Sequence, residues 1–283
     1  NFLCYFVNVK KNILFLNHSV RDGGPGKSLF YLLKHFDYSS YNVNVLIPSK
    51  NNFSENIEKN NLNVNQIIDK NFPENLKKPN LNMFGNSIPL FFIDILINIL
   101  RLVFLSITIK DIIKDNKIDL LYCNGTQAKI FGAIIGKIYN IKTVWHVRNI
   151  QKSFLLSWFI NSFSKFNNVS KIICVSKATS NQFKINTKNI VINNGVDTSE
   201  FSLRSVNSKL REEYNIDSKK IIIGTAGRIV PRKGFDYFIE VCKQISHEFK
   251  KDCIFVIVGD TPFYFKQKIM ENLKTMVKEY NLE

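Results

Sequence analysis

The chain has 283 residues, 45% of them hydrophobic and 13% aromatic, which excludes an intrinsically disordered chain and allows one large or two modest folded domains. Its 39 basic and 23 acidic residues give a formal net charge of +16, which suits anionic partners or, alternatively, a surface rich in solvated lysine. The five cysteines are far apart and form no CxxC pair, which argues against a disulfide framework or a zinc site and favours a reducing compartment.

The first predicted element is an apolar strand over residues 12–17, followed by a glycine-rich loop and a helix. The letters GKS at 26–28 resemble the end of a Walker A loop. That motif needs a glycine five positions before Gly26, and the residue there is Arg21. The loop is therefore predicted to be a turn between strand and helix, and the reading as an NTP-hydrolysing P-loop protein is weakened.

Alternating strand-like and helix-like segments fill the rest of the first 200 residues. Further strands are predicted at residues 42–48, 64–68, 119–124, 142–147, 171–176 and 189–194, with helices between most of them, including 126–139 and 152–166. Continuous β-branched runs separated by helices are typical of parallel strands buried on both faces. The sequence therefore predicts a doubly wound α/β fold. The segment 69–87, with Pro73, Pro79 and Gly85, is predicted to be a loop or an excursion.

The apolar segment 88–115 is long enough to be tested as a membrane span. A spanning helix needs about 20 apolar residues with few or no charges. Asp94, Asn98 and Arg101 interrupt the run at its centre, where charge is costly. A long buried or interface-lying helix is predicted instead, and peripheral membrane contact stays open as an alternative.

A second α/β unit is predicted after a polar stretch around residues 198–219. Its predicted strands and helices are 220–227, 233–249, 253–260 and 262–280. Two strands are fewer than the five or six of a Rossmann-like sheet, so this domain is predicted to be incomplete. We therefore predict a first domain over 1–200 and a partial second domain over 201–283.

The stretch GTAGRIVPRKGFDYFIEV, residues 224–241, combines basic residues with a strand end and a helix start. Arg228 follows the predicted strand, and Lys233 lies just before the helix. Ligands of parallel sheets bind at the carboxyl ends of the strands, and helix N-termini there favour anions. The planar guanidinium group of an arginine and the mobile ammonium group of a lysine suit binding of a diphosphate. Gly234 permits the backbone to approach such a ligand closely.

The part GRIVPRKGFDYFIEV closely resembles the signature of the family-4 retaining glycosyltransferases, which have the GT-B fold of two Rossmann-like domains with parallel sheets. Other stretches are similar in the family's order, namely 23–36, 118–137, 143–150, 172–183, 192–201 and 255–262. In the last of these Thr261 replaces a glycine of the family's pattern. The resemblance covers nearly all of the chain from about residue 12. The family's donor domain continues to a Glu-x7-Glu motif that this sequence does not reach, so a C-terminally truncated chain is expected.

The resemblance implies a donor site made by both domains. Arg228 and Lys233 would bind the diphosphate of a nucleotide-sugar donor. Gly23 and Gly24 would let backbone amides approach the donor phosphate and the transferred sugar.

The resemblance also implies a catalytic role for His146, which would contact the sugar near its reacting carbon. Arg148 lies two residues further along and is expected on the same side of the strand, so it is a candidate contact for an anionic group of acceptor or donor. Neutralising the charge of the departing diphosphate would contribute strongly to lowering the reaction barrier. No metal or cofactor is expected, and no general base is identified.

The expected function is transfer of a sugar, with retention, from a nucleotide sugar to a glycan or lipid-linked acceptor in surface polysaccharide or glycolipid synthesis. A cytoplasmic protein is expected, with attachment to the inner membrane face as an option. The alternative is a non-catalytic, truncated GT-B relic that acts as a binding or membrane-associated module. The charge alone would suit a nucleic-acid binder, but no RRM, KH or helix-turn-helix signature occurs, so no nucleic-acid partner is expected.

Overall fold

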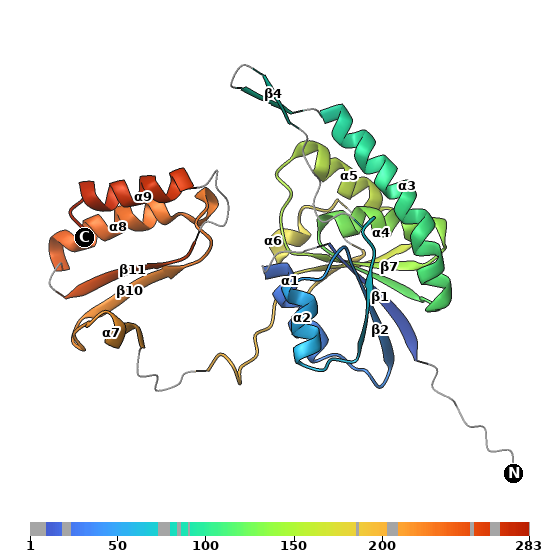
Figure 1. Cartoon of the computed structure of the whole chain (residues 1–283), viewed down its shortest axis with the longest axis horizontal. Coiled ribbons are helices and arrows are strands. Elements are labelled where there is room, and N and C mark those ends of the chain that lie inside the picture. Colours follow the sequence, from blue (N-terminus) through green and yellow to red (C-terminus); the bar gives the residue numbers. More distant parts are fainter. Residues whose placement is uncertain are drawn as a thin grey trace, which may run out of the picture. The chain divides into compact units, whose positions relative to one another are not determined.

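The computed structural model describes residues 10–18, 24–72, 80–83, 86–89, 91–184, 187–202, 209–249, 252–260 and 267–282. The chain divides into two compact units, an N-terminal unit Asn1–Phe201 and a C-terminal unit Ser202–Glu283. Figure 1 labels their elements.

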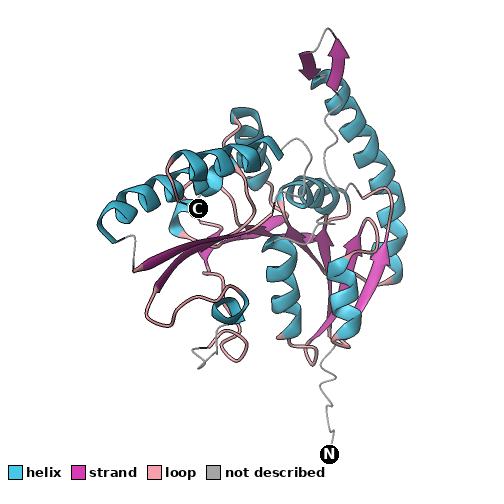
Figure 2. Ribbon diagram, turned by 60° about the vertical axis from the view of Figure 1, so that its left-hand side comes forward, coloured by secondary structure: helices cyan, strands magenta, loops and turns pink. Residues whose placement is uncertain are grey.

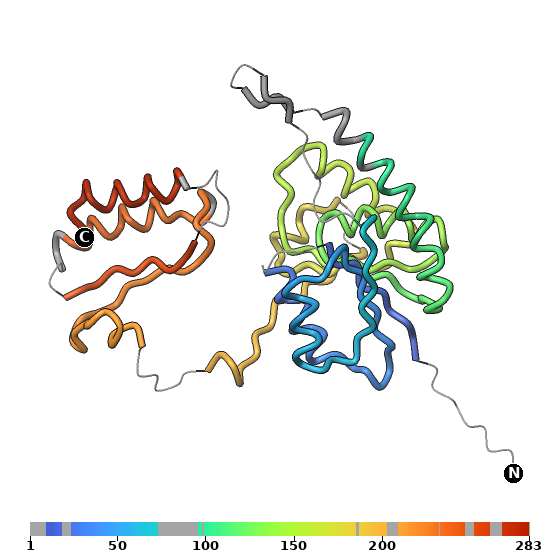
Figure 3. Tube along the Cα trace, viewed as in Figure 1, coloured from blue at the N-terminus to red at the C-terminus, as the bar shows by residue number. Residues whose placement is uncertain are grey.

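The N-terminal unit is built on a parallel sheet of seven strands in the order β3-β2-β1-β6-β7-β8-β9. The strands are β1 Lys11–Asn17, β2 Tyr41–Ile47, β3 Val64–Ile68, β6 Leu120–Asn124, β7 Lys142–Val147, β8 Val169–Cys174 and β9 Asn189–Val191. The predicted strands and the doubly wound α/β class are confirmed. In the Cα trace the blue first strands and the green later strands meet where β1 pairs with β6 (Figure 3). The strand order reverses there, and doubly wound folds bind ligands at such a point.

Helices cover both faces of this sheet (Figure 2). They are α1 Gly24–Lys34, α2 Asn52–Lys59, α3 Phe91–Asp115, α4 Thr126–Ile138, α5 Phe154–Ser164 and the short α6 Lys177–Ser180. Successive β1 side chains point to opposite faces. Phe15 packs in one core with residues of α1 and α2, and Leu14 packs in the other with residues of α3, α4 and α5.

The segment predicted as a loop at 69–87 contains an element that the sequence reading missed. Strands β4 Asn80–Met83 and β5 Asn86–Pro89 form an antiparallel pair with Leu81 opposite Ile88. The loop prediction is therefore wrong for this part. Strands of four residues carry too little alternation to be recognised beside the prolines and glycine of the segment.

Helix α3 lies along the N-terminal unit with one side packed on the core. Leu105 and Ile109 of this helix are fully buried. A second side leaves large apolar residues exposed, namely Leu96, Ile99, Leu100, Val103, Phe104 and Ile107. Within the part of the chain that the structure describes, no helix has the length and apolar character needed to cross a membrane.

The C-terminal unit contains a two-stranded parallel sheet of β10 Ile221–Ala226 and β11 Cys253–Val258. Its helices are α7 Lys209–Glu213, the 3-10 helix η1 Pro231–Lys233, α8 Phe235–Phe249 and α9 Gln267–Glu279. Its small core is formed by Ile229, Phe235, Ile239 and Leu273. The predicted small second sheet is confirmed.

Candidate active site

Two buried asparagines lie at the carboxyl ends of neighbouring strands, at the point where the strand order reverses. Asn17 ends β1 and Asn124 ends β6, and both are fully buried. The Asn124 amide donates to Asn17 Oδ1 at 3.0 Å and to the Pro25 carbonyl at 3.2 Å. These bonds satisfy polar groups inside an apolar unit and fix the start of α1 above the strand ends.

His146 lies near the end of β7, directly opposite Asn124 in the sheet register. Its Nδ1 is 2.7 Å from the Tyr122 hydroxyl and 3.0 Å from Arg148 Nη2. A guanidinium group can only donate, so Nδ1 accepts and the ring proton resides on Nε2.

Burial, more than the nearby charges, keeps the ring of His146 neutral. Burial lowers the pKa of His146 to about 3, and the positive charges of Arg148 and Lys129 add to this effect. Burial also raises the pKa of the Tyr122 hydroxyl to about 12. At neutral pH His146 therefore offers one N–H donor at Nε2 and carries no charge.

Arg148 connects three elements around His146. It donates to Asn124 Oδ1 through Nη1 and to Ser28 Oγ of α1 at 3.1 Å through Nη2. Its Nε is buried without a hydrogen-bond partner among the described residues. Burial lowers the pKa of Arg148 to about 10, so the side chain stays charged at neutral pH.

Two cavities meet at His146. The larger, of about 380 Å³, is lined by residues of α1, Tyr122, His146, Ile173 and the segment 192–197. The smaller, of about 120 Å³, is lined by His18, Pro25, Gly125, Thr126, Lys129, His146, Arg148 and Asn149. The sequence analysis did not identify Lys129, Tyr122 or the two asparagines.

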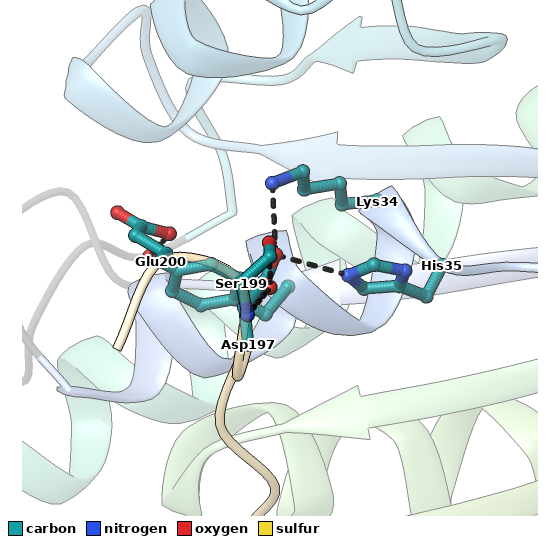
Figure 4. Close-up of polar contacts among 6 residues, drawn as sticks. Lys34, His35, Asp197, Ser199 and Glu200 are labelled. Carbon is teal, nitrogen blue, oxygen red and sulfur yellow. Dashed lines mark hydrogen bonds and ion pairs between the residues drawn. The ribbon is translucent and has the colours of Figure 1, made fainter. Parts of the chain in front are cut away.

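A short segment after β9 is fastened to α1 by polar contacts (Figure 4). Lys34 Nζ lies 3.1 Å and His35 Nε2 lies 3.6 Å from Asp197 Oδ2. Ser199 donates to Asp197 Oδ1 through its backbone N–H and its hydroxyl, and Tyr31 donates to Glu200 at 2.7 Å. The hydrogen bonds from Ser199 and then Lys34 hold the pKa of Asp197 well below its usual range. This network fixes the wall of the larger cavity.

The glycine loop before α1 is described only in part. Gly24 begins α1, and a methyl group placed on it would meet no atom of the described residues within 4 Å. As far as these residues show, the space beside this helix start is open. Gly23 lies outside the described residues.

Arg228 and Lys233 lie together between β10 and α8 in the C-terminal unit. Gly227 and Gly234 adopt positive φ angles of 156° and 67° on either side of this turn. A methyl group on Gly227 would lie 3.9 Å from Lys233 Cε. The turn therefore holds the two basic residues near the carboxyl end of β10, where a parallel sheet binds anions.

Two sequence families match the chain. Residues 22–200 match the family described as Glycosyltransferase Family 4, and residues 206–283 match Glycosyl transferases group 1. The first match alone covers more than half of the 283 residues.

Two characterised relatives share about a quarter of their residues with the chain over the aligned parts. A UDP-Gal:alpha-D-GlcNAc-diphosphoundecaprenol alpha-1,3-galactosyltransferase of Escherichia coli is 24% identical over 172 residues, which are 54% of this chain and 43% of the relative. The phosphatidylinositol N-acetylglucosaminyltransferase GPI3 subunit of Saccharomyces cerevisiae is 25% identical over 175 residues, 57% of this chain and 38% of the relative. The matched parts thus span less than half the length of these curated relatives.

The fold is similar to that of a solved cyanobacterial protein. The structure of Anabaena Alr3699/HepE in complex with UDP and glucose superposes with a TM-score of 0.70 at 21% identity, covering 96% of this chain and 67% of that one. The likeness confirms the overall fold that the sequence predicts.

Proposed function

Because the chain belongs to glycosyltransferase family 4, we propose that it transfers a sugar, with retention, from a nucleotide sugar to a glycan or lipid-linked acceptor. The observation that carries this proposal is His146, which is hydrogen-bonded to Tyr122 and Arg148 and lines two cavities beside the strand-order reversal. Doubly wound folds bind nucleotides and their substrates at this position.

In this proposal His146 contacts the donor sugar through its Nε2–H. Arg148 occupies Nδ1, so the ring donates a hydrogen bond to a sugar hydroxyl and takes up no proton there. The N–H group of His146 is held in place by buried contacts. It therefore needs no reorganisation as charge develops in the transition state. His146 is thus proposed as a catalytic residue by orientation and polarisation.

Arg228, Lys233 and Gly24 are proposed to bind the donor phosphates. The arginine can form two parallel hydrogen bonds and the lysine contributes a mobile positive charge, and both suit the diphosphate that departs during transfer. The open helix start at Gly24 provides backbone N–H groups for anionic oxygens. Neutralisation of the leaving group in this way requires no bound metal, and we propose a metal-free reaction.

The retaining outcome is proposed from the resemblance to the family-4 retaining glycosyltransferases, and the cavity walls bear on how retention would be reached. Of the described residues that line the two cavities, Asp197 alone carries a carboxylate, and it is bonded to Lys34 and Ser199. A double displacement requires a free carboxylate nucleophile beside the sugar. We therefore propose attack on the same face of the sugar, assisted by the departing phosphate.

We further propose that the acceptor is lipid-linked, in surface polysaccharide or glycolipid synthesis at the inner membrane face. The E. coli relative is named for a diphosphoundecaprenol acceptor, and the yeast relative is a phosphatidylinositol glycosyltransferase subunit. The exposed apolar side of α3 and the net charge of +16 suit contact with an anionic membrane.

Calorimetric titration of the chain with UDP, UDP-glucose, UDP-galactose and UDP-N-acetylglucosamine tests the donor site. UDP is the first choice because HepE was crystallised with UDP and glucose. We expect at least one of these ligands to bind, and Arg228→Ala to weaken binding at least tenfold, about 1.4 kcal/mol or more, because a charge-assisted contact is lost. Chelation of divalent metals with EDTA should leave the affinity unchanged.

The matched control for this titration is Lys219→Ala, which removes an exposed cation from the same unit. It should bind as the parent chain does. Equal affinity of the Arg228→Ala variant and the parent chain would contradict the donor site, whereas binding without any sugar transfer would support the non-catalytic module.

A further inference from the structure

Lys129 is a buried cation that the proposed reaction does not yet use. It lies in the first turn of α4, is only 2% exposed, and lines the smaller cavity. Among the described residues the structure gives its ammonium group no hydrogen bond and no ion pair. An isolated buried charge is costly, so buried cations in proteins are normally paired.

The other groups around the smaller cavity make it more positive. Arg148 is charged and, among the described residues, has no carboxylate partner, and its Nε has no hydrogen-bond partner. None of the described lining residues is acidic. Among the described residues, the site therefore holds two cations with no anion to balance them.

Two helices begin at the smaller cavity. Pro25 of α1 and Thr126 of α4 line it, and these helices have 11 and 13 residues. The N-cap of α4 is Gly125, which has no side chain to accept the first N–H groups of the helix. Its φ is +116°, and a Cβ there would collide with the His18 ring, so glycine is required for the close packing. The start of α4 adds partial positive charge and N–H donors, whereas Pro25 of α1 has no N–H to donate.

We propose that the smaller cavity binds a phosphate group through Lys129 and Arg148, and that this phosphate belongs to the acceptor. The forked guanidinium of Arg148, the ammonium of Lys129 and the N-terminus of α4 together match a tetrahedral dianion. A volume of about 120 Å³ suits one small group and is well below the size of a site for a whole nucleotide sugar. The assignment to the acceptor rests on the proposed function, which places the donor diphosphate at Arg228 and Lys233.

The test measures calorimetric binding of inorganic phosphate, pyrophosphate and UDP to the full chain and three variants. Lys129→Met removes the charge and keeps the length of the side chain. Lys137→Met is the matched control, because Lys137 lies on the same helix but is exposed. Arg228→Ala removes the proposed donor contact in the other unit.

We expect inorganic phosphate to bind the parent chain, the Lys137→Met variant and the Arg228→Ala variant equally, and the Lys129→Met variant at least tenfold more weakly. UDP should bind the Lys129→Met variant as it binds the parent chain. The melting temperature of the Lys129→Met variant without ligand should equal or exceed that of the parent, because an unpaired buried charge has been removed. If that variant fails to fold, Lys129→Gln provides the same comparison.

Phosphate binding that is absent from the parent chain, or is equal in the Lys129→Met variant, would overturn the site. Parallel loss of phosphate and UDP binding in that variant would assign the phosphate to the donor and overturn the acceptor assignment. If the chain binds phosphate through Lys129 but binds no UDP or UDP-sugar, the anion site is upheld and the proposed donor function fails.

Discussion

At the scale of single residues, the site depends on polar side chains placed where apolar strands end. Asn17 and Asn124 join two strand ends, and Asn124 also accepts from Arg148. Arg148 in turn fixes the tautomer of His146. Substitution of one member therefore leaves another buried polar group without its partner, which costs about 1–3 kcal/mol.

Two partly buried histidines, His18 and His146, predict how stability responds to acid. Burial lowers the pKa of His146 to about 3 and that of His18 to about 4, whereas histidine in an unfolded chain titrates near 6.5. Below about pH 6.5 the unfolded chain therefore binds protons that the native chain does not. The free energy of unfolding should be retained above that pH and fall by up to about 1.4 kcal/mol per pH unit for each histidine between roughly pH 6 and 4.

Urea unfolding at a series of pH values measures this slope. His146→Asn and His18→Asn should each reduce the slope by about one proton, and the double variant by about two. A slope that is identical in the parent chain and in both variants would show that these rings are already charged in the native state.

At the scale of elements, the sequence was sufficient to predict the strands of the N-terminal sheet. It was not sufficient to predict which side chains of neighbouring strands contact each other. Continuous β-branched runs predicted the ends of the strands in the N-terminal sheet to within three residues. The motif TVWHVRN placed His146 and Arg148 on one side of a strand. The hydrogen bond from Tyr122 to His146 depends on the β6–β7 register, which no local pattern specifies.

Lys129 could have been found from helical spacing. It shares a face of α4 with Gly132, Ala133 and Gly136, three and four residues apart along the helix. Side chains added to the two glycines would collide with Cys123 of β6 and Thr143 of β7, so this face packs closely on the sheet. A lysine on a face of small residues is a signal of a buried cation. The roles predicted from the sequence stay predictions for all six site residues, namely Gly23, Gly24, His146, Arg148, Arg228 and Lys233.

The exposed side of α3 predicts binding to anionic membranes. The chain should sediment with vesicles rich in phosphatidylglycerol, and Leu100→Asp or Phe104→Asp should reduce binding about tenfold or more, because each removes a large apolar side chain from the contact. Ile138→Asp, which changes an exposed apolar residue at the end of α4, is the control and should bind as the parent does. Equal loss in all three variants would contradict a role for α3.

At the scale of the whole molecule, two units carry the two halves of the proposed chemistry. The N-terminal unit holds His146, Arg148 and both cavities, and the C-terminal unit holds Arg228 and Lys233. Membership of glycosyltransferase family 4 rests on the match over residues 22–200. Part of the family signature has a reason in backbone geometry, because Gly227 and Gly234 adopt positive φ angles that favour glycine.

The most direct measurement of the central claim is sugar transfer by the parent chain and the His146→Ala variant, with the anomeric configuration of the product determined by NMR. The proposal predicts a product that retains the donor's configuration, a kcat lowered roughly 100-fold or more in the variant, and unchanged UDP affinity, since His146 acts on the sugar and not on the nucleotide. An inverted product, or a variant as active as the parent, would contradict it.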